Sequence, residues 1–193
     1  MLSLEESLKI LKETKALIEG HFILSSGLHS PKYVQCAQLM SKPSQATQIC
    51  HSLVKKIKSE FENIDLILSP AMGGIVVGYE IGKLLGVETI FSERVNGKFQ
   101  LRRDFKIKQN TNVLIVEDVI TTGKSSIECS NLVKENKANI VGYACIIDRS
   151  NGKTEINDKI ISQIKLNIPT YKKENLPKEL ISIDPVKPGS RNL

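Results

Sequence analysis

The sequence predicts an α/β fold in which a central parallel sheet carries helices on both faces. Apolar runs of strand length alternate with amphipathic runs of helix length, and glycine-bearing turns join the two. The chain has 193 residues, of which 40% are hydrophobic and 25% charged, which fits one domain with a sizeable core. Ligands of such sheets bind at the carboxyl ends of the strands.

The N-terminal part of the chain is expected to form one helix and one hairpin. Ser3 and Glu6 have the spacing of a capping box, and apolar residues on one face continue the helix until Gly20. Residues 21–36 then hold two short apolar runs around a Ser-Gly turn, which is typical of a hairpin. Pro43 is expected to open a second helix that runs to about Lys58.

The remaining elements are expected to alternate along the chain. The predicted strands are residues 65–68, 87–91, 112–116 and 140–147. A predicted helix covers residues 75–85, and another ends near residue 135. The polar residues 92–110 lack periodicity and are expected to form a loop, while four prolines from Pro169 onward indicate a surface tail.

Composition excludes several classes of protein. No apolar run reaches the roughly 20 residues of a membrane helix, and early acids in the N-terminal segment argue against a signal peptide, so a cytoplasmic protein without a membrane partner is expected. The four cysteines form no CxxC pair, so they are expected to be reduced and buried rather than zinc ligands. These are Cys36, Cys50, Cys129 and Cys145.

The net charge of +6 comes from lysines spread over the chain. Tryptophan is absent and aromatics make up 5%, so stacking platforms for bases are scarce and no nucleic acid partner is expected. The basic excess suits a small anionic ligand such as a phosphate.

The segment VLIVEDVITTGKSS, residues 113–126, carries the most chemical information. An apolar strand delivers Glu117 and Asp118 to its carboxyl end, and a turn with hydroxyl side chains around Gly123 then opens a helix. The free amides of a helix start bind phosphate. Since the carboxylates would repel a phosphate, the ligand is expected to present hydroxyls as well, as ribose does, or a divalent cation.

This segment has two alternative interpretations. The sequence TGKS matches the end of an ATPase P-loop, but that motif requires a glycine where Asp118 stands. An ordinary capped strand-turn-helix is the simpler alternative, which explains less well why two acids stand side by side at the strand tip.

The same segment resembles the phosphoribosyl pyrophosphate (PRPP) signature of the type I phosphoribosyltransferases. Over nearly its whole length the chain is similar to the orotate enzymes of that family, through FILSSGLHSPKYV, SPAMGGIVVGYE and ERVNGKFQLRRDF. The resemblance implies a type I phosphoribosyltransferase fold as a single domain. Its expected parts are a helix and hairpin hood over about 1–40, a PRPP-binding core over about 41–168 and a tail over about 169–193.

The implied reaction transfers phosphoribosyl from PRPP to N1 of orotate in pyrimidine biosynthesis, with Mg²⁺ held mainly by PRPP and water rather than by direct protein ligands. A homodimer with shared sites is also implied. Two alternatives stay open: a purine-base phosphoribosyltransferase and a non-catalytic PRPP-sensing regulator. The first is distinguished by the base pocket, because an anionic base needs a cation.

The resemblance also assigns roles to residues. Asp118, Lys98 and Arg94 are the expected catalytic residues, and Thr121 and Arg149 the expected contacts to orotate. The expected PRPP-binding residues are Glu117, Asp118, Val119, Ile120, Thr121, Thr122, Gly123, Lys124 and Ser125, and those for pyrophosphate are Ala71, Met72, Gly73 and Gly74.

The chain departs from the orotate enzymes at two lysines and in one loop. Ser25 and Met72 stand where many of these enzymes have lysine, and the loop 92–108 lacks their lysine-rich pattern. The candidate loop cations are Arg94, Lys98, Arg102 and Arg103.

Overall fold

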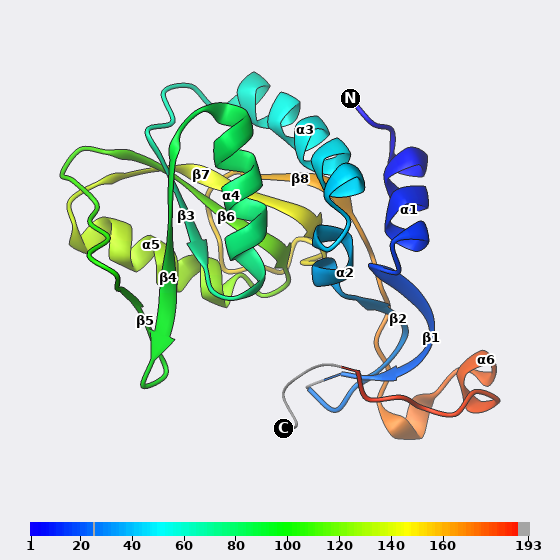
Figure 1. Cartoon of the computed structure of the whole chain (residues 1–193). Helices are drawn as coiled ribbons and strands as arrows, with labels where there is room; N and C mark the ends of the chain where they lie inside the picture. Colours follow the sequence, from blue (N-terminus) through cyan, green and yellow to red (C-terminus); the bar gives the residue numbers. More distant parts are fainter. Residues whose placement is uncertain (25, 189–193) are drawn as a thin grey trace.

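A six-stranded sheet forms the centre of the chain in the computed structural model, which describes residues 1–24 and 26–188 (Figure 1). The strand order is β5-β4-β3-β6-β7-β8, with β5 antiparallel to β4 and the other neighbours parallel. The strands are β3 (Leu66–Pro70), β4 (Glu88–Val95), β5 (Lys98–Leu101), β6 (Asn112–Ile120), β7 (Asn139–Asp148) and β8 (Ile160–Lys165).

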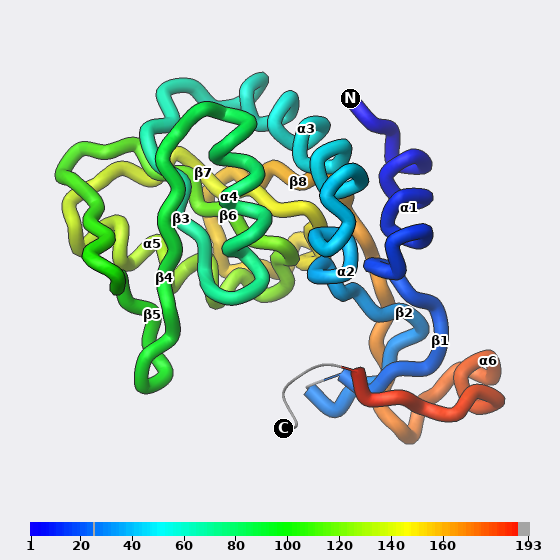
Figure 2. Tube along the Cα trace, viewed as in Figure 1, coloured from blue at the N-terminus to red at the C-terminus, as the bar shows by residue number. Residues whose placement is uncertain are grey.

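Helices cover both faces of this sheet, which confirms the predicted fold class (Figure 2). Helices α3 (Pro43–Glu60) and α4 (Gly73–Leu85) pack on one face in a cluster with Ile67, Leu114 and Val116 of the strands. Helix α5 (Lys124–Glu135) packs on the other face in a second cluster. Because adjacent strand residues point to opposite faces, one strand supplies both clusters.

A separate two-stranded hairpin lies beside the sheet, as the sequence predicted. It consists of β1 (Leu17–Ile23) and β2 (His29–Val34), between α1 (Leu4–Glu13) and α2 (Cys36–Met40). The C-terminal segment, with η1 (Lys173–Asn175) and α6 (Lys178–Ile181), runs along this hairpin (Figure 1).

The first helix ends earlier than predicted. The capping box of Ser3 and Glu6 is present, but α1 stops at Glu13 rather than near Gly20. Lys15 has a left-handed φ of 57°, which breaks the helix, and Leu17 then pairs with Val34 in the hairpin. Strand pairing and burial of Leu17 therefore override the helical spacing of the apolar residues.

The predicted loop at 92–110 is partly wrong. Strand β4 continues to Val95 and turns at Asn96 and Gly97, whose φ values of 50° and 81° suit a tight hairpin turn into β5. The Asn-Gly pair between alternating residues was the signal for this hairpin. We call residues 88–101 the arm.

Other differences concern short or edge elements. Strand β8 at the sheet edge and the five-residue α2 had no predicted counterpart. Strand β6 extends to Ile120, so Glu117 and Asp118 lie within it rather than after it. In the described part of the chain, no helix is long and apolar enough to cross a membrane.

Candidate active site

Residues 121–123 join β6 to α5 at the carboxyl edge of the sheet, and we call them the phosphate-type turn because the sequence predicts phosphate binding there. Gly123 precedes α5 with a left-handed φ of 81°, so the turn requires a residue without a side chain there. Thr121 and Thr122 are exposed and Ser125 is half-buried, so their hydroxyls border the start of the helix. The exposed hydroxyls and the α5 amides therefore lie together where the sequence predicts an anion site.

Residues 154–156, which follow β7, pack against this turn. A Cβ atom on Gly123 would lie 2.4 Å from Thr154 Oγ1 and 2.8 Å from Ile156 Cγ1. Thr154 Oγ1 donates to the Thr122 carbonyl at 3.1 Å, and the Glu155 amide approaches the same oxygen at 3.3 Å. Close packing against Gly123 therefore fixes the backbone of the turn.

The two carboxylates of β6 point to opposite faces of the sheet, as strand geometry requires. Glu117 accepts a hydrogen bond from Ser126 in the first turn of α5. Burial raises the pKa of Glu117 to about 7, although the Ser126 hydroxyl works against the shift. Burial also raises the pKa of Asp118, which the amides of Val119 and Asp118 itself oppose. Burial therefore disfavours the charged form of both carboxylates, and a cation or a hydroxyl donor on a ligand would offset that cost.

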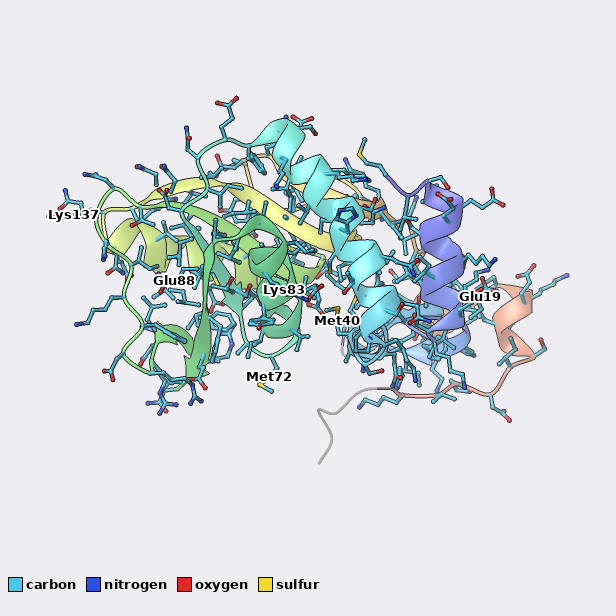
Figure 3. The ribbon with its side chains drawn as sticks, turned by 45° about the horizontal axis from the view of Figure 1, so that its top comes forward. Glu19, Met40, Met72, Lys83, Glu88 and Lys137 are labelled. Atoms are coloured by element: carbon cyan, nitrogen blue, oxygen red, sulfur yellow. The ribbon has the colours of Figure 1, made fainter. Side chains whose placement is uncertain are left out.

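The Asp118 carboxylate lies against the start of α4. A Cβ atom on Gly73 would be 2.6 Å from Asp118 Oδ2 and 2.7 Å from Oδ1, so a larger residue at position 73 would displace this carboxylate. Ala71 and Met72 form the turn before the helix, which Gly73 and Gly74 begin. The Ala71 amide donates to the Ser92 carbonyl at 2.8 Å, and the Ala71–Met72 peptide is cis. Figure 3 shows Met72 projecting from this turn, where 81% of the residue is exposed. The two predicted anion-binding turns therefore meet at Asp118.

Arg149 follows β7 at the same edge. Its amide donates to the Ile120 carbonyl at 2.8 Å, which places it beside the end of β6. Burial lowers the pKa of the Arg149 guanidinium, and nearby Tyr33 opposes this shift. Its buried Nε has no hydrogen-bond partner among the residues that the structure describes. Tyr33, on β2 of the hairpin, therefore approaches the site, as does Cys36, whose Sγ lies 3.9 Å from the Asp118 carbonyl oxygen.

The candidate loop cations lie on or just after the arm. Arg94 pairs with Glu128 of α5 at 2.8 Å and lies 4.2 Å above the Phe99 ring, while Lys98 is exposed. Arg103 pairs with Glu93 at 3.0 Å. Within residues 1–24 and 26–188, Arg94 and Lys98 form no hydrogen bond or ion pair with the phosphate-type turn. The structure thus brings together Asp118, the two turns and Arg149, but not the arm cations.

Sequence reasoning did not find three residues that shape the site. Ser126 orients Glu117 and could have been noticed as the second serine of TTGKSS. Tyr33 and Thr154 come from segments far from the signature, and no local pattern marks them. Ser25, one of the predicted departures, lies outside the described residues, as do residues 189–193 of the expected tail. Among the described residues no group of three His, Cys, Asp or Glu side chains could hold a metal ion.

Comparison with known proteins decides the family. The Phosphoribosyl transferase domain family matches residues 41–177. The chain is 46% identical over 190 residues to an orotate phosphoribosyltransferase of Methylorubrum extorquens, with 98% of this chain and 97% of that protein covered. The chain belongs to the phosphoribosyltransferase family. The likeness to its orotate enzymes that the sequence predicted is confirmed.

Solved structures of the family share the fold. The orotate phosphoribosyltransferase of Aeropyrum pernix superposes with a TM-score of 0.72 at 23% identity, covering 82% of this chain and 92% of that one. An adenine phosphoribosyltransferase of Saccharomyces cerevisiae reaches a TM-score of 0.67 at 19% identity, covering 81% and 99%. Since phosphoribosyltransferases for different bases share this fold, the fold itself does not select the base.

The raised pKa of Glu117 gives a testable pH dependence of stability. The folded chain favours the protonated acid, so this contribution is complete below the ordinary value of 4.5 and lost as pH rises through about 7. Relative to Glu117→Gln, the wild type is expected to lose up to about 3 kcal/mol of unfolding free energy between pH 4.5 and pH 8. Urea unfolding of both proteins across this range measures the difference, with Glu135→Gln, at an exposed residue of α5, as the control. Parallel curves for wild type and Glu117→Gln would exclude a perturbed Glu117.

Proposed function

We propose that the chain transfers the phosphoribosyl group from PRPP to N1 of orotate, giving orotidine 5′-phosphate and pyrophosphate. One observation carries the proposal: Asp118 lies between the phosphate-type turn before α5 and the start of α4 at Gly73. A ligand with phosphates at both ends and ribose hydroxyls in the middle fits this order of groups. The names of the relatives at more than 40% identity support the same reaction.

The chemistry required by the transfer matches the arrangement. The 5′-phosphate would bind Thr121 to Ser125 at the start of α5, and pyrophosphate would bind residues 71–74 at the start of α4. The anomeric carbon becomes positively charged as pyrophosphate departs, so amides aimed at the leaving group stabilise the transition state. Glu117 and Asp118 would hold the ribose hydroxyls and thereby fix the sugar between the two reactants.

Mg²⁺ fits the donor set, because partly buried carboxylate oxygens at Glu117 and Asp118 suit a hard cation that keeps several waters. The ion, bound mainly by PRPP and water, would neutralise charge on the phosphates. The cytoplasmic location stays a prediction from the sequence.

The base pocket is proposed at Arg149 and Tyr33. The guanidinium, whose buried Nε lacks a partner in the described chain, supplies the cation that the orotate carboxylate needs. A neutral purine base would leave this cation without a counter-ion, so the arrangement favours an anionic base.

Arg149→Ala is expected to weaken orotate binding by about 10- to 150-fold, because a charge-assisted hydrogen bond contributes about 1.5–3 kcal/mol. PRPP affinity should change little, since the two ligands use different turns. Calorimetric titration with each ligand checks this, with Lys153→Ala, at an exposed residue nearby, as the control. Equal losses for both ligands would contradict the assignment.

A homodimer is part of the proposal, and the exposed side of α4 supports it. Met72, Val76 and Tyr79 are spaced four and three residues apart, and they expose 81%, 51% and 65% of their surface. A second copy covering this side would reach the pyrophosphate turn, which leads directly into it. The arm of one chain would then complete the site of its partner.

The direct test is an absorbance assay of orotate consumption with PRPP and Mg²⁺. We expect turnover with orotate and none with adenine, guanine or hypoxanthine at equal concentration. Turnover with a purine base alone would favour the purine enzyme. Tight PRPP binding without consumption of any base would favour the PRPP-sensing regulator.

A further inference from the structure

Two histidines of the hairpin contact each other and the C-terminal segment. His21 on β1 and His29 on β2 expose only 4% and 5% of their surface. His21 Nε2 lies 2.6 Å from His29 Nδ1, and His21 Nδ1 lies 2.8 Å from the carbonyl oxygen of Ile183. The rings therefore connect both strands to a segment more than 150 residues away in the sequence.

The partners determine which ring atoms carry protons. A carbonyl oxygen only accepts, so His21 Nδ1 must donate to Ile183. A neutral imidazole has one N–H, so His21 Nε2 is the acceptor and His29 Nδ1 is the donor of the bond between the rings. The neutral pair is a directed chain of two hydrogen bonds from His29 through His21 to Ile183.

The pair accommodates one extra proton but not two. A first proton on His29 Nε2 leaves both hydrogen bonds intact. A second proton would have to enter on His21 Nε2, where two N–H groups would face each other across 2.6 Å. It would also leave two positive charges in a buried contact, which is costly.

Backbone pairing attaches the C-terminal segment at the same two residues. The Val186 amide donates to the His21 carbonyl at 2.8 Å, and Tyr171 and His29 exchange two backbone hydrogen bonds of 2.8 Å. The segment thus flanks the hairpin on both outer edges, with the ring pair between the attachments. Loss of the ring contact would loosen both attachments.

The same strand reaches the proposed base pocket. Tyr33 stands four residues after His29 on β2 and lies near Arg149. Cys36 follows three residues later, and its Sγ lies 3.9 Å from the Asp118 carbonyl oxygen. The position of β2 therefore sets the position of Tyr33.

We propose that His21 and His29 are positioning residues, whose shared proton holds the C-terminal segment on the hairpin and so fixes Tyr33 at the base pocket. Only the identity of the base rests on the proposed function.

The proton arrangement can be measured without any activity. The chain has three histidines, and the third, His51, is exposed on α3 and serves as an internal control. In ¹⁵N-histidine NMR spectra of the wild type at pH 8, His21 and His29 are both expected as Nδ1–H tautomers. An Nε2–H tautomer at either residue would overturn the proposal, whatever the substrate proves to be.

Two variants of His29 separate positioning from simple packing. His29→Asn keeps an N–H donor near the Nδ1 position, whereas His29→Leu removes the donor and leaves His21 Nε2 unpaired. At pH 8, His29→Leu is expected to raise KM for orotate about tenfold with kcat within about twofold, and to speed trypsin cleavage at Lys172 and Lys178. His29→Asn should match the wild type in both measurements at pH 8.

Equal behaviour of the two variants in both the trypsin and the KM measurements would overturn the positioning role. If orotate is not the substrate, the KM measurement fails for the wild type as well, while the difference in trypsin cleavage between the two variants remains. Failure of the proposed function and failure of this inference are therefore distinguishable. His51→Asn is the matched control and should change neither measurement.

Discussion

Asp118→Asn is expected to lower kcat/KM for the phosphoribosyl transfer by about 100-fold or more. Its carboxylate lies between the two anion-binding turns, where it would hold ribose hydroxyls, and removal of one positioned polar group costs about 3 kcal/mol in the transition state. Folding should be unaffected, because asparagine has the same shape and burial already disfavours the charged form of Asp118.

Steady-state kinetics and thermal unfolding of the variant measure both parts of this expectation. Asp158→Asn, at an exposed residue after β7, is the matched control and should keep wild-type kinetics. A well-folded Asp118→Asn protein with wild-type kcat/KM would remove Asp118 from the site.

Mixing two inactive variants is expected to restore about a quarter of the wild-type activity. One variant carries Arg94→Ala and Lys98→Ala in the arm, and the other carries Asp118→Asn. Random pairing makes about half of the dimers mixed, and each mixed dimer has one intact site of two if the arm serves the partner chain. Activity after co-refolding in equal amounts measures the recovery.

This expectation depends on movement of the arm. Arg94 now pairs with Glu128 of its own chain, so reaching a partner's site would break that ion pair. The pair is partly exposed, so its loss costs little. If mixing restores nothing while each single refolding control regains its fold, the arm serves its own chain and the shared-site proposal is wrong.

The parts of the fold that depend on local patterns could be predicted from sequence. The apolar run before Glu117, the turn at Gly123 and the helix after it form one continuous unit, and the structure has them in that order. The end of α1 could not be predicted, because Leu17 pairs with Val34, which is distant in sequence. Strand β8 is equally non-local, since its pairing with β7 and not its own pattern defines it.

In the candidate site, too, local features could be predicted and contacts between distant segments could not. Asp118, Gly73 and Arg149 stand at strand ends or helix starts, which the alternation of elements brings to one edge. The contact between Gly73 and Asp118 and the approach of Tyr33 to Arg149 join segments that only the folded chain brings together. Their roles in binding remain proposals.

The most direct test of the central claim is a ³¹P NMR spectrum of the wild-type reaction with PRPP, orotate and Mg²⁺. We expect the PRPP signals to disappear only when orotate is present, and pyrophosphate and one new phosphomonoester to appear in equal amounts. Mass spectrometry should identify that monoester as orotidine 5′-phosphate. Unchanged PRPP, or release of pyrophosphate at the same rate without orotate, would contradict it.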